Sequence, residues 1–241
     1  FAPAMVRDLT KGRPANVILL FAFPIILGNV FQQIYSVVDS IIVGRYVSYQ
    51  ALAGVGITNG LTFFIFGFVI GITSGLGIMT AQFFGAKNFK RMRQSLGTGF
   101  IICLGLSFIL TLLAAASIRP SLQFIGASDE IYDYSCDYLR IIYFGLITQV
   151  AYNMVACILR ALGDSKTPLY FLIFSSVLNI GLDILFVKTF GWGVKGVAWA
   201  TVVSQLVSAI FCFGYVFTRY TNLRLIGEDF RTSWSFIWEH L

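Results

Sequence analysis

The sequence predicts an all-α, polytopic membrane protein with six transmembrane helices. Hydrophobic residues make up 57% of its 241 residues, charged residues make up 12%, and the mean hydropathy is +0.81, which is far from the balance of a soluble domain. A helix needs about 20 apolar residues to cross the hydrocarbon core of a bilayer. Six stretches meet this length, at residues 15–43, 51–80, 94–117, 136–158, 169–187 and 196–217. An even number of spans places both chain ends on one side of the membrane.

The first two spans contain residues that shape helix packing. Pro24 lies in the middle of the first span, where it removes a backbone hydrogen bond, so we expect a bend in that helix. The second span carries seven glycines, which let membrane helices pack closely or leave room for a cavity. Gly-Ala-Lys-Asn at 85–88 predicts the turn that leads toward the third span.

The later spans are separated by polar segments. Asp129, Glu130 and Asp133 predict a solvated acidic loop before the fourth span. Gly-Asp-Ser-Lys-Thr-Pro at 163–168 predicts a turn, and a proline there suits the start of the fifth helix. We assign residues 1–220 to one transmembrane lobe. Residues 221–241 are more polar and end in an amphipathic run, which is typical of a segment at the membrane interface, and we interpret them as a cytoplasmic linker.

The distribution of basic residues predicts the orientation. Twelve Lys and Arg residues lie in the termini and the even-numbered loops, against four in the odd-numbered loops. Because basic loops are retained in the cytoplasm, we expect a multi-pass protein of the cell (inner) membrane with both ends cytoplasmic. Arg140 belongs to neither set; near the outer end of its span it can snorkel to the interface or pair with Asp137. The net charge of +6 thus reflects topology, and no clustered basic and aromatic surface indicates nucleic-acid binding.

The residue types that support enzymes or tightly bound metals are scarce. The four cysteines fall in or beside the spans without paired spacing, so we interpret them as small apolar packing residues. His240, the single histidine, stands next to the chain end. We therefore expect neither an enzyme nor a cofactor.

Two aspartates inside the apolar spans are the strongest functional signal. Asp39 and Asp183 are surrounded by aliphatic residues, and a carboxylate in hydrocarbon must face a cavity, find partners or carry a proton. Asp39 is about 36 Å along its helix and Asp183 about 21 Å along the fifth, at about 1.5 Å per residue, so both occupy overlapping depths. Thr201 reaches the same level from the sixth span, and Asn179 lies one helical turn from Asp183.

These four side chains could form one cation site. Two carboxylates, an amide and a hydroxyl supply the oxygen ligands that suit a hard cation such as Na⁺, and two close carboxylates can share H⁺. The alternative is structural: Asp39 reaches the interface, while Asn179 and Asp183 satisfy neighbouring backbone groups.

Further polar residues on the inner helix faces predict a cavity for a small molecule. Gln32, Tyr35 and Asp39 are spaced by three and four and so form one stripe of the first helix. Amide and aromatic groups with many phenylalanines around them suit amphipathic organic molecules, although ordinary hydrogen bonding between helices would use the same residues. The predicted cavity residues are Gln32, Gln33, Tyr35, Asn59, Gln149, Tyr152, Asn153 and Ser176.

At residues 15–220 the chain resembles the multidrug and toxic compound extrusion (MATE) transporters. The resemblance depends on Pro24, Gln32 and Val-Val-Asp39 in the first span and on several longer motifs. These are Ala-Leu-Ala-Gly-Val-Gly at 51–56, Ala-Gln-Phe-Phe-Gly-Ala at 81–86, Leu-Arg-Ala-Leu-Gly-Asp-Ser-Lys-Thr-Pro at 159–168 and Leu-Asn-Ile-Gly-Leu-Asp-Ile-Leu-Phe at 178–186.

The resemblance implies one lobe of a twelve-helix, two-lobed exporter that is driven by Na⁺ or H⁺. It also implies a cation site whose members match Asp39, Asn179, Asp183 and Thr201. The exported molecules would be amphipathic, cationic drugs or metabolites, moved by alternating access. Because this chain covers one lobe, the second six-helix lobe would come from the full-length protein, from another chain or from a second copy. The alternatives are a flippase of lipid-linked precursors with the same fold and a half-transporter fragment that does not transport.

Overall fold

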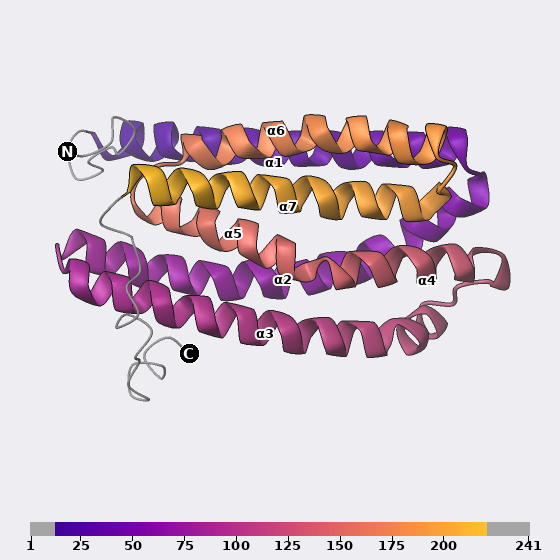
Figure 1. The fold of residues 1–241 in the computed structure, drawn as a ribbon, viewed down its shortest axis with the longest axis horizontal. Helices are drawn as coiled ribbons and strands as arrows, with labels where there is room; N and C mark the ends of the chain where they lie inside the picture. Colours follow the sequence, from indigo (N-terminus) through magenta and orange to yellow (C-terminus); the bar gives the residue numbers. More distant parts are fainter. Residues whose placement is uncertain (1–12, 221–241) are drawn as a thin grey trace.

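The computed structural model describes residues 13–220, which form an elongated bundle of helices (Figure 1). Within this range five helices are long and apolar enough to cross a membrane, and a bent pair of helices forms a sixth span. The all-α, multi-pass fold class is therefore confirmed. The helices are α1 (Pro14–Tyr46), α2 (Tyr49–Gly85), α3 (Phe89–Phe124), α4 (Asp129–Phe144), α5 (Leu146–Ala161), α6 (Lys166–Asp183), the π-helix η1 (Ile184–Thr189) and α7 (Gly193–Arg219).

Local sequence explains where several helices begin. Pro14 opens α1, where its missing N–H costs nothing. The Ser48 hydroxyl accepts a hydrogen bond from the Ala51 N–H at the start of α2, and the Asn88 side chain accepts one from the Arg91 N–H at the start of α3. Pro24 lies inside α1, and the helix continues through it.

The fourth span differs from the straight helix at 136–158 that the sequence predicts. It consists of α4 and α5, which meet at Gly145 with an angle of 46°. A Cβ atom at Gly145 would overlap the side chain of Val202, so α7 packs directly against the bend. The predicted acidic loop is also wrong, because Asp129, Glu130 and Asp133 belong to the first turns of α4.

The glycines of α2 have two kinds of surroundings. A Cβ atom at Gly54 would approach Tyr134 to 2.9 Å, and one at Gly77 would approach Cys157 to 3.3 Å, so α2 packs closely on α4 and α5 there. The other six glycines of the helix have open space around them: Gly56, Gly60, Gly67, Gly71, Gly75 and Gly85. The expected close packing thus occurs at Gly54 and Gly77, and of the α2 glycines only Gly77 also lines the cavity described below.

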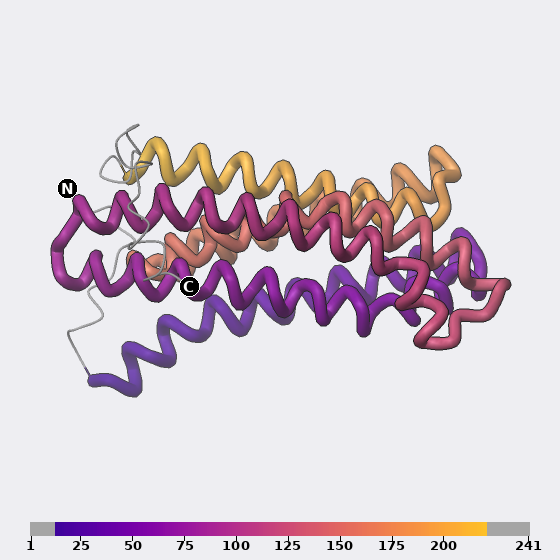
Figure 2. The backbone as a smooth tube through the Cα atoms, turned by 90° about the horizontal axis from the view of Figure 1, so that it is seen from below, coloured from indigo at the N-terminus to yellow at the C-terminus, as the bar shows by residue number. Residues whose placement is uncertain are grey.

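The arrangement of α1 leaves room inside the bundle. In Figure 1, α1, α6 and α7 run alongside one another. Figure 2 shows that α1 and α2 lie together where they are joined and diverge toward the N-terminal end of α1. We call the end of the bundle with residues 13 and 220 the terminal end; it also carries the α2–α3 and α5–α6 turns, and the opposite end is the far end.

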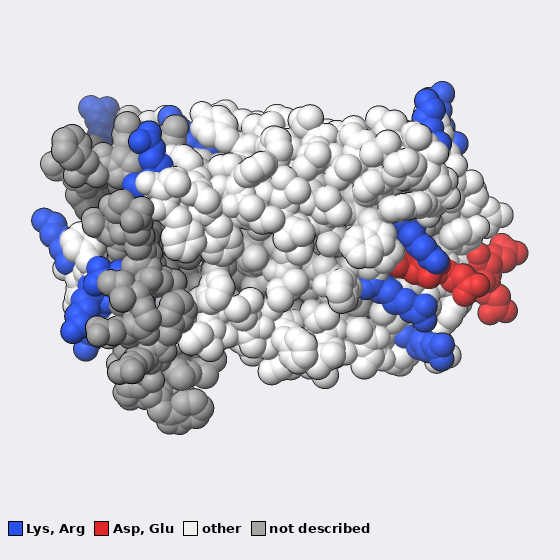
Figure 3. Space-filling model, in the orientation of Figure 1, with Lys and Arg blue, Asp and Glu red and all other residues white. Residues whose placement is uncertain are grey.

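The face of the molecule in Figure 3 has an uncharged middle and charged ends, as a membrane-spanning protein requires. Large apolar side chains such as Phe23 and Phe63 are 64% and 82% exposed in the middle zone. At the far end Lys195 forms an ion pair of 3.2 Å with Asp137. Asp137 is thus paired with a residue of α7, which corrects the pairing with Arg140 that the sequence suggested.

Candidate functional site

The two intramembrane aspartates come together between α1 and α6. Asp39 is 8% exposed and Asp183, the last residue of α6, is fully buried. Their side chains interact directly with each other. Yet Asp39 Oδ1 and both oxygens of Asp183 have no hydrogen-bond donor among the described residues. Two ionised carboxylates only accept hydrogen bonds, so a proton or a cation between them would supply the partner that the described side chains do not.

The other two predicted cation ligands are also neighbours. The Asn179 Nδ2 donates to Thr201 Oγ1 over 3.4 Å, and Thr201 in turn donates to the Val197 carbonyl over 3.1 Å. Asn179 Oδ1 is buried and lacks a donor among the described residues. Since Asn179 lies one turn before Asp183 on α6, this free oxygen is on the same helix face as the acidic pair.

Two residues that were not among the predicted site residues also lie near the acidic pair. Tyr138 of α4 interacts electrostatically with Asp39 and Asp183. Gln205 of α7 lies beside Tyr35, which is itself close to both acids. Gln205 follows Thr201 by four residues and so shares its helix face, a signal that was present in the sequence. Tyr138 carried no such signal: it lies within the predicted span at 136–158, and nothing in its local sequence indicates that it faces the two aspartates.

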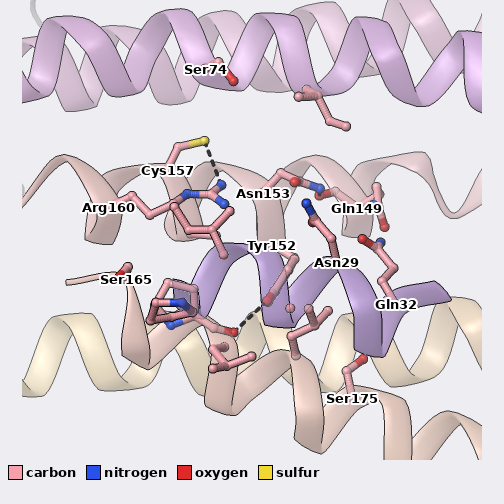
Figure 4. Close-up of a pocket in the computed structure, with 18 of the residues that line it drawn as sticks. Asn29, Gln32, Ser74, Gln149, Tyr152, Asn153, Cys157, Arg160, Ser165 and Ser175 are labelled. Carbon is pink, nitrogen blue, oxygen red and sulfur yellow. Dashed lines mark hydrogen bonds between the residues drawn. The ribbon is translucent and has the colours of Figure 1, made fainter. Parts of the chain in front are cut away.

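A cavity of about 560 Å³ lies beside the acidic pair, enclosed by α1, α2, α5, α6 and α7. This volume suits a drug-sized molecule. Five of the predicted cavity residues line it, namely Gln32, Tyr35, Gln149, Tyr152 and Asn153. Figure 4 shows the amide groups of Asn29, Gln32, Gln149 and Asn153 gathered where α1 faces α5.

Three other predicted residues do not line this cavity, for reasons of helix geometry. Gln33 is exposed, because adjacent residues on a helix are about 100° apart and Gln32 takes the inner position. Asn59 is exposed on α2. The Ser176 hydroxyl donates to the Leu172 carbonyl of its own helix over 2.9 Å, whereas its neighbour Ser175 lines the cavity.

The cavity wall connects to the acidic pair through shared residues. Tyr35, Asn179, Thr201 and Gln205 all line the cavity, whereas Asp39 and Asp183 lie behind it. The side-chain oxygens of Gln149, Asn179 and Gln205 are buried without a donor among the described residues. The wall thus offers unpaired acceptors to a ligand that carries N–H or O–H groups. The two acids lie behind this wall and do not line the cavity themselves.

Comparison with known proteins supports one family. The sequence model of the MatE family matches residues 24–185. The probable multidrug resistance protein YoeA of Bacillus subtilis is 33% identical over 221 residues, which cover 90% of this chain and 48% of the relative. A crystal structure of MATE in the bent conformation matches the whole chain and 54% of its own, with a TM-score of 0.90 and 27% identity. A crystal structure of MATE in the straight conformation matches with a TM-score of 0.88 and 27% identity. The chain spans about half the length of the curated relatives it matches.

Proposed function

Because this chain belongs to the MatE family of transporters, we propose that it forms one lobe of an efflux transporter in which Na⁺ or H⁺ enters as an amphipathic organic molecule leaves. The observation that carries the coupling is the buried acidic pair, Asp39 and Asp183, three of whose four carboxylate oxygens lack a donor among the described residues. A membrane protein keeps such a costly pair only where it serves a purpose.

The same pair explains how an ion and an organic molecule could compete. Occupation by H⁺ or Na⁺ removes the repulsion between the carboxylates and lets α1 and α6 approach. Release of the ion restores that repulsion. Tyr35 of α1 lies close to both acids and lines the cavity, and Asn179 of α6, one turn before Asp183, lines it too. A shift of α1 against α6 would therefore change the cavity wall. Each ligand would thus favour a different shape of the lobe, which is the requirement for exchange.

We propose further that a second six-helix lobe completes the transporter, from the same protein or from another chain. The support is that the chain spans about half of the length of its relatives. We also propose that the terminal end faces the cytoplasm of the cell (inner) membrane.

The function is tested with the assembled transporter in proteoliposomes, with Na⁺ and H⁺ gradients imposed separately. We expect Asp39→Asn and Asp183→Asn each to reduce gradient-driven substrate movement to background while membrane insertion is unchanged. Asp137→Asn is the matched control, because this aspartate is ion-paired at the far end, and we expect nearly native transport. Native rates in both test variants would eliminate ion coupling at this pair.

A further inference from the structure

The charge on the cavity wall indicates the substrate class, on the premise of the proposed efflux function. Arg160 is the single charged side chain among the described residues that line the cavity. It lies at the end of α5, next to the α5–α6 turn at the terminal end. The acidic pair does not neutralise the charge of Arg160, because it lies at the other end of α6. Asp183 is 17 residues along this helix from Lys166, about 25 Å at about 1.5 Å per residue.

The guanidinium of Arg160 is poorly satisfied by the protein. Its Nη2 donates to Cys157 Sγ over 3.2 Å (Figure 4), and sulfur is a weak acceptor. No carboxylate within residues 13–220 forms an ion pair with it. Guanidinium groups have five donors in a planar fork that matches carboxylate and phosphate oxygens.

Polar residues lead from Arg160 into the cavity along one stripe of α5. Gln149, Asn153, Cys157 and Arg160 follow one another at intervals of four, four and three residues and all line the cavity. The stripe spans about 16 Å at about 1.5 Å per residue. Its inner end offers the unpaired carbonyl oxygen of Gln149, which needs a donor, and its outer end offers a cation.

We infer that this lobe recognises an amphipathic organic anion, whose carboxylate or phosphate group pairs with Arg160 while its N–H or O–H groups face Gln149. The MATE resemblance alone favours a cationic molecule, but a cation in this cavity would meet Arg160 and no carboxylate on the described wall. In this scheme Asp39 and Asp183 bind the coupling ion and do not pair with the organic molecule.

Equilibrium binding to the purified, assembled transporter without any ion gradient tests this inference. Two xanthene dyes of similar size serve as probes: anionic carboxyfluorescein and cationic rhodamine 123, with binding followed by fluorescence anisotropy. We expect carboxyfluorescein to bind more tightly, Arg160→Gln to weaken it about ten-fold or more, and Arg160→Lys to retain most of the affinity. Rhodamine 123 should be unaffected by Arg160→Gln or bind more tightly.

Lys90→Gln is the matched control, because it removes one positive charge from the same end of the bundle at an exposed position outside the cavity. It should leave carboxyfluorescein binding unchanged. Equal weakening of both dyes by Arg160→Gln, tighter binding of rhodamine 123 by the native protein, or binding of neither dye would each overturn the inference. These results are separate from those of the gradient experiment, since a transporter of cations would still show ion coupling.

Discussion

Two buried aspartates at opposite ends of α6 have opposite surroundings. Asp164, just before the helix, accepts hydrogen bonds from the N–H groups of Lys166 and Thr167, from the Thr167 hydroxyl at 2.6 Å and from the Tyr220 hydroxyl at 3.2 Å. Asp183, at the other end, has no donor among the described residues. A carboxylate with four donors stabilises a fold, whereas one with none destabilises it unless a ligand is bound.

This contrast predicts opposite effects on stability. Asp164→Ala should lower the thermal unfolding midpoint of the purified protein in detergent, corresponding to about 2–4 kcal/mol, because a cap and a buried network are lost. Asp183→Asn should leave the midpoint unchanged or raise it, because the substitution removes an uncompensated buried charge. If Asp183→Asn destabilises as much as Asp164→Ala, Asp183 has a structural role and the ion site is in doubt.

Tyr220 provides a second test of the same network. Burial and the adjacent Asp164 carboxylate raise the pKa of Tyr220 above its ordinary value, so the phenol remains a protonated donor at neutral pH. Tyr220→Phe should therefore cost about 1 kcal/mol of stability, seen as a lower unfolding midpoint. In the background of Asp164→Ala the same substitution should have almost no effect, and an undiminished effect would show that Tyr220 acts independently of Asp164.

Among the helices, the bend between α4 and α5 depends on close contact with α7. Gly145→Ala should overlap Val202 and cost about 1–3 kcal/mol. The double variant Gly145→Ala with Val202→Ala should recover much of the lost stability, because the smaller side chain at 202 leaves room for the new methyl group. Gly105→Ala on the open side of α3, where nothing lies within 4 Å of the added Cβ, should be neutral or stabilising. Thermal unfolding of the three variants and the native protein in one detergent compares these effects. A Gly145→Ala midpoint equal to that of Gly105→Ala would contradict the packing account.

Helix α1 is the element expected to change shape with ion occupancy. Pro24 removes one backbone hydrogen bond about four turns from Asp39, and it also lines the cavity. We predict that α1 differs in curvature between structures with and without Na⁺, or at low and high pH, and that Pro24→Ala reduces this difference and slows transport more than it weakens equilibrium binding. An α1 of constant curvature despite altered occupancy at Asp39 would exclude this relay.

For the molecule as a whole, much of the architecture could be predicted from the sequence, and the exceptions have physical causes. The length of the apolar stretches predicted six membrane spans. Helical spacing predicted that Gln32 and Tyr35 lie on one face of α1, and both line the cavity. The bend at Gly145 and the contacts of Tyr138 depend on how α4 packs against α7 and α1. Local sequence patterns do not predict such packing between distant segments. In the sequence Arg160 is only a basic residue near a turn, because the cavity wall that it joins is also built from residues of α1, α2, α6 and α7.

The orientation of the molecule can be tested with single cysteines. The four native cysteines are buried, so background labelling should be low. A cysteine at exposed Lys195 of the far end should react with a membrane-impermeant maleimide in whole cells, whereas one at exposed Lys90 of the terminal end should react only after permeabilisation. The reverse pattern would place the termini outside and contradict the basic-residue rule.

The charge of the molecule that pairs with Arg160 decides how strongly the membrane voltage acts on transport. If the substrate pairs with Arg160 as a monovalent anion, exchanging it outward for one inward H⁺ or Na⁺ moves two positive charges into the cell per cycle. A membrane potential of 100 mV contributes about 2.3 kcal/mol per charge, and so about 4.6 kcal/mol to each cycle. An inside-negative voltage alone would then drive export without any ion concentration gradient. Exchange of a monovalent cation in place of the anion would be electrically silent.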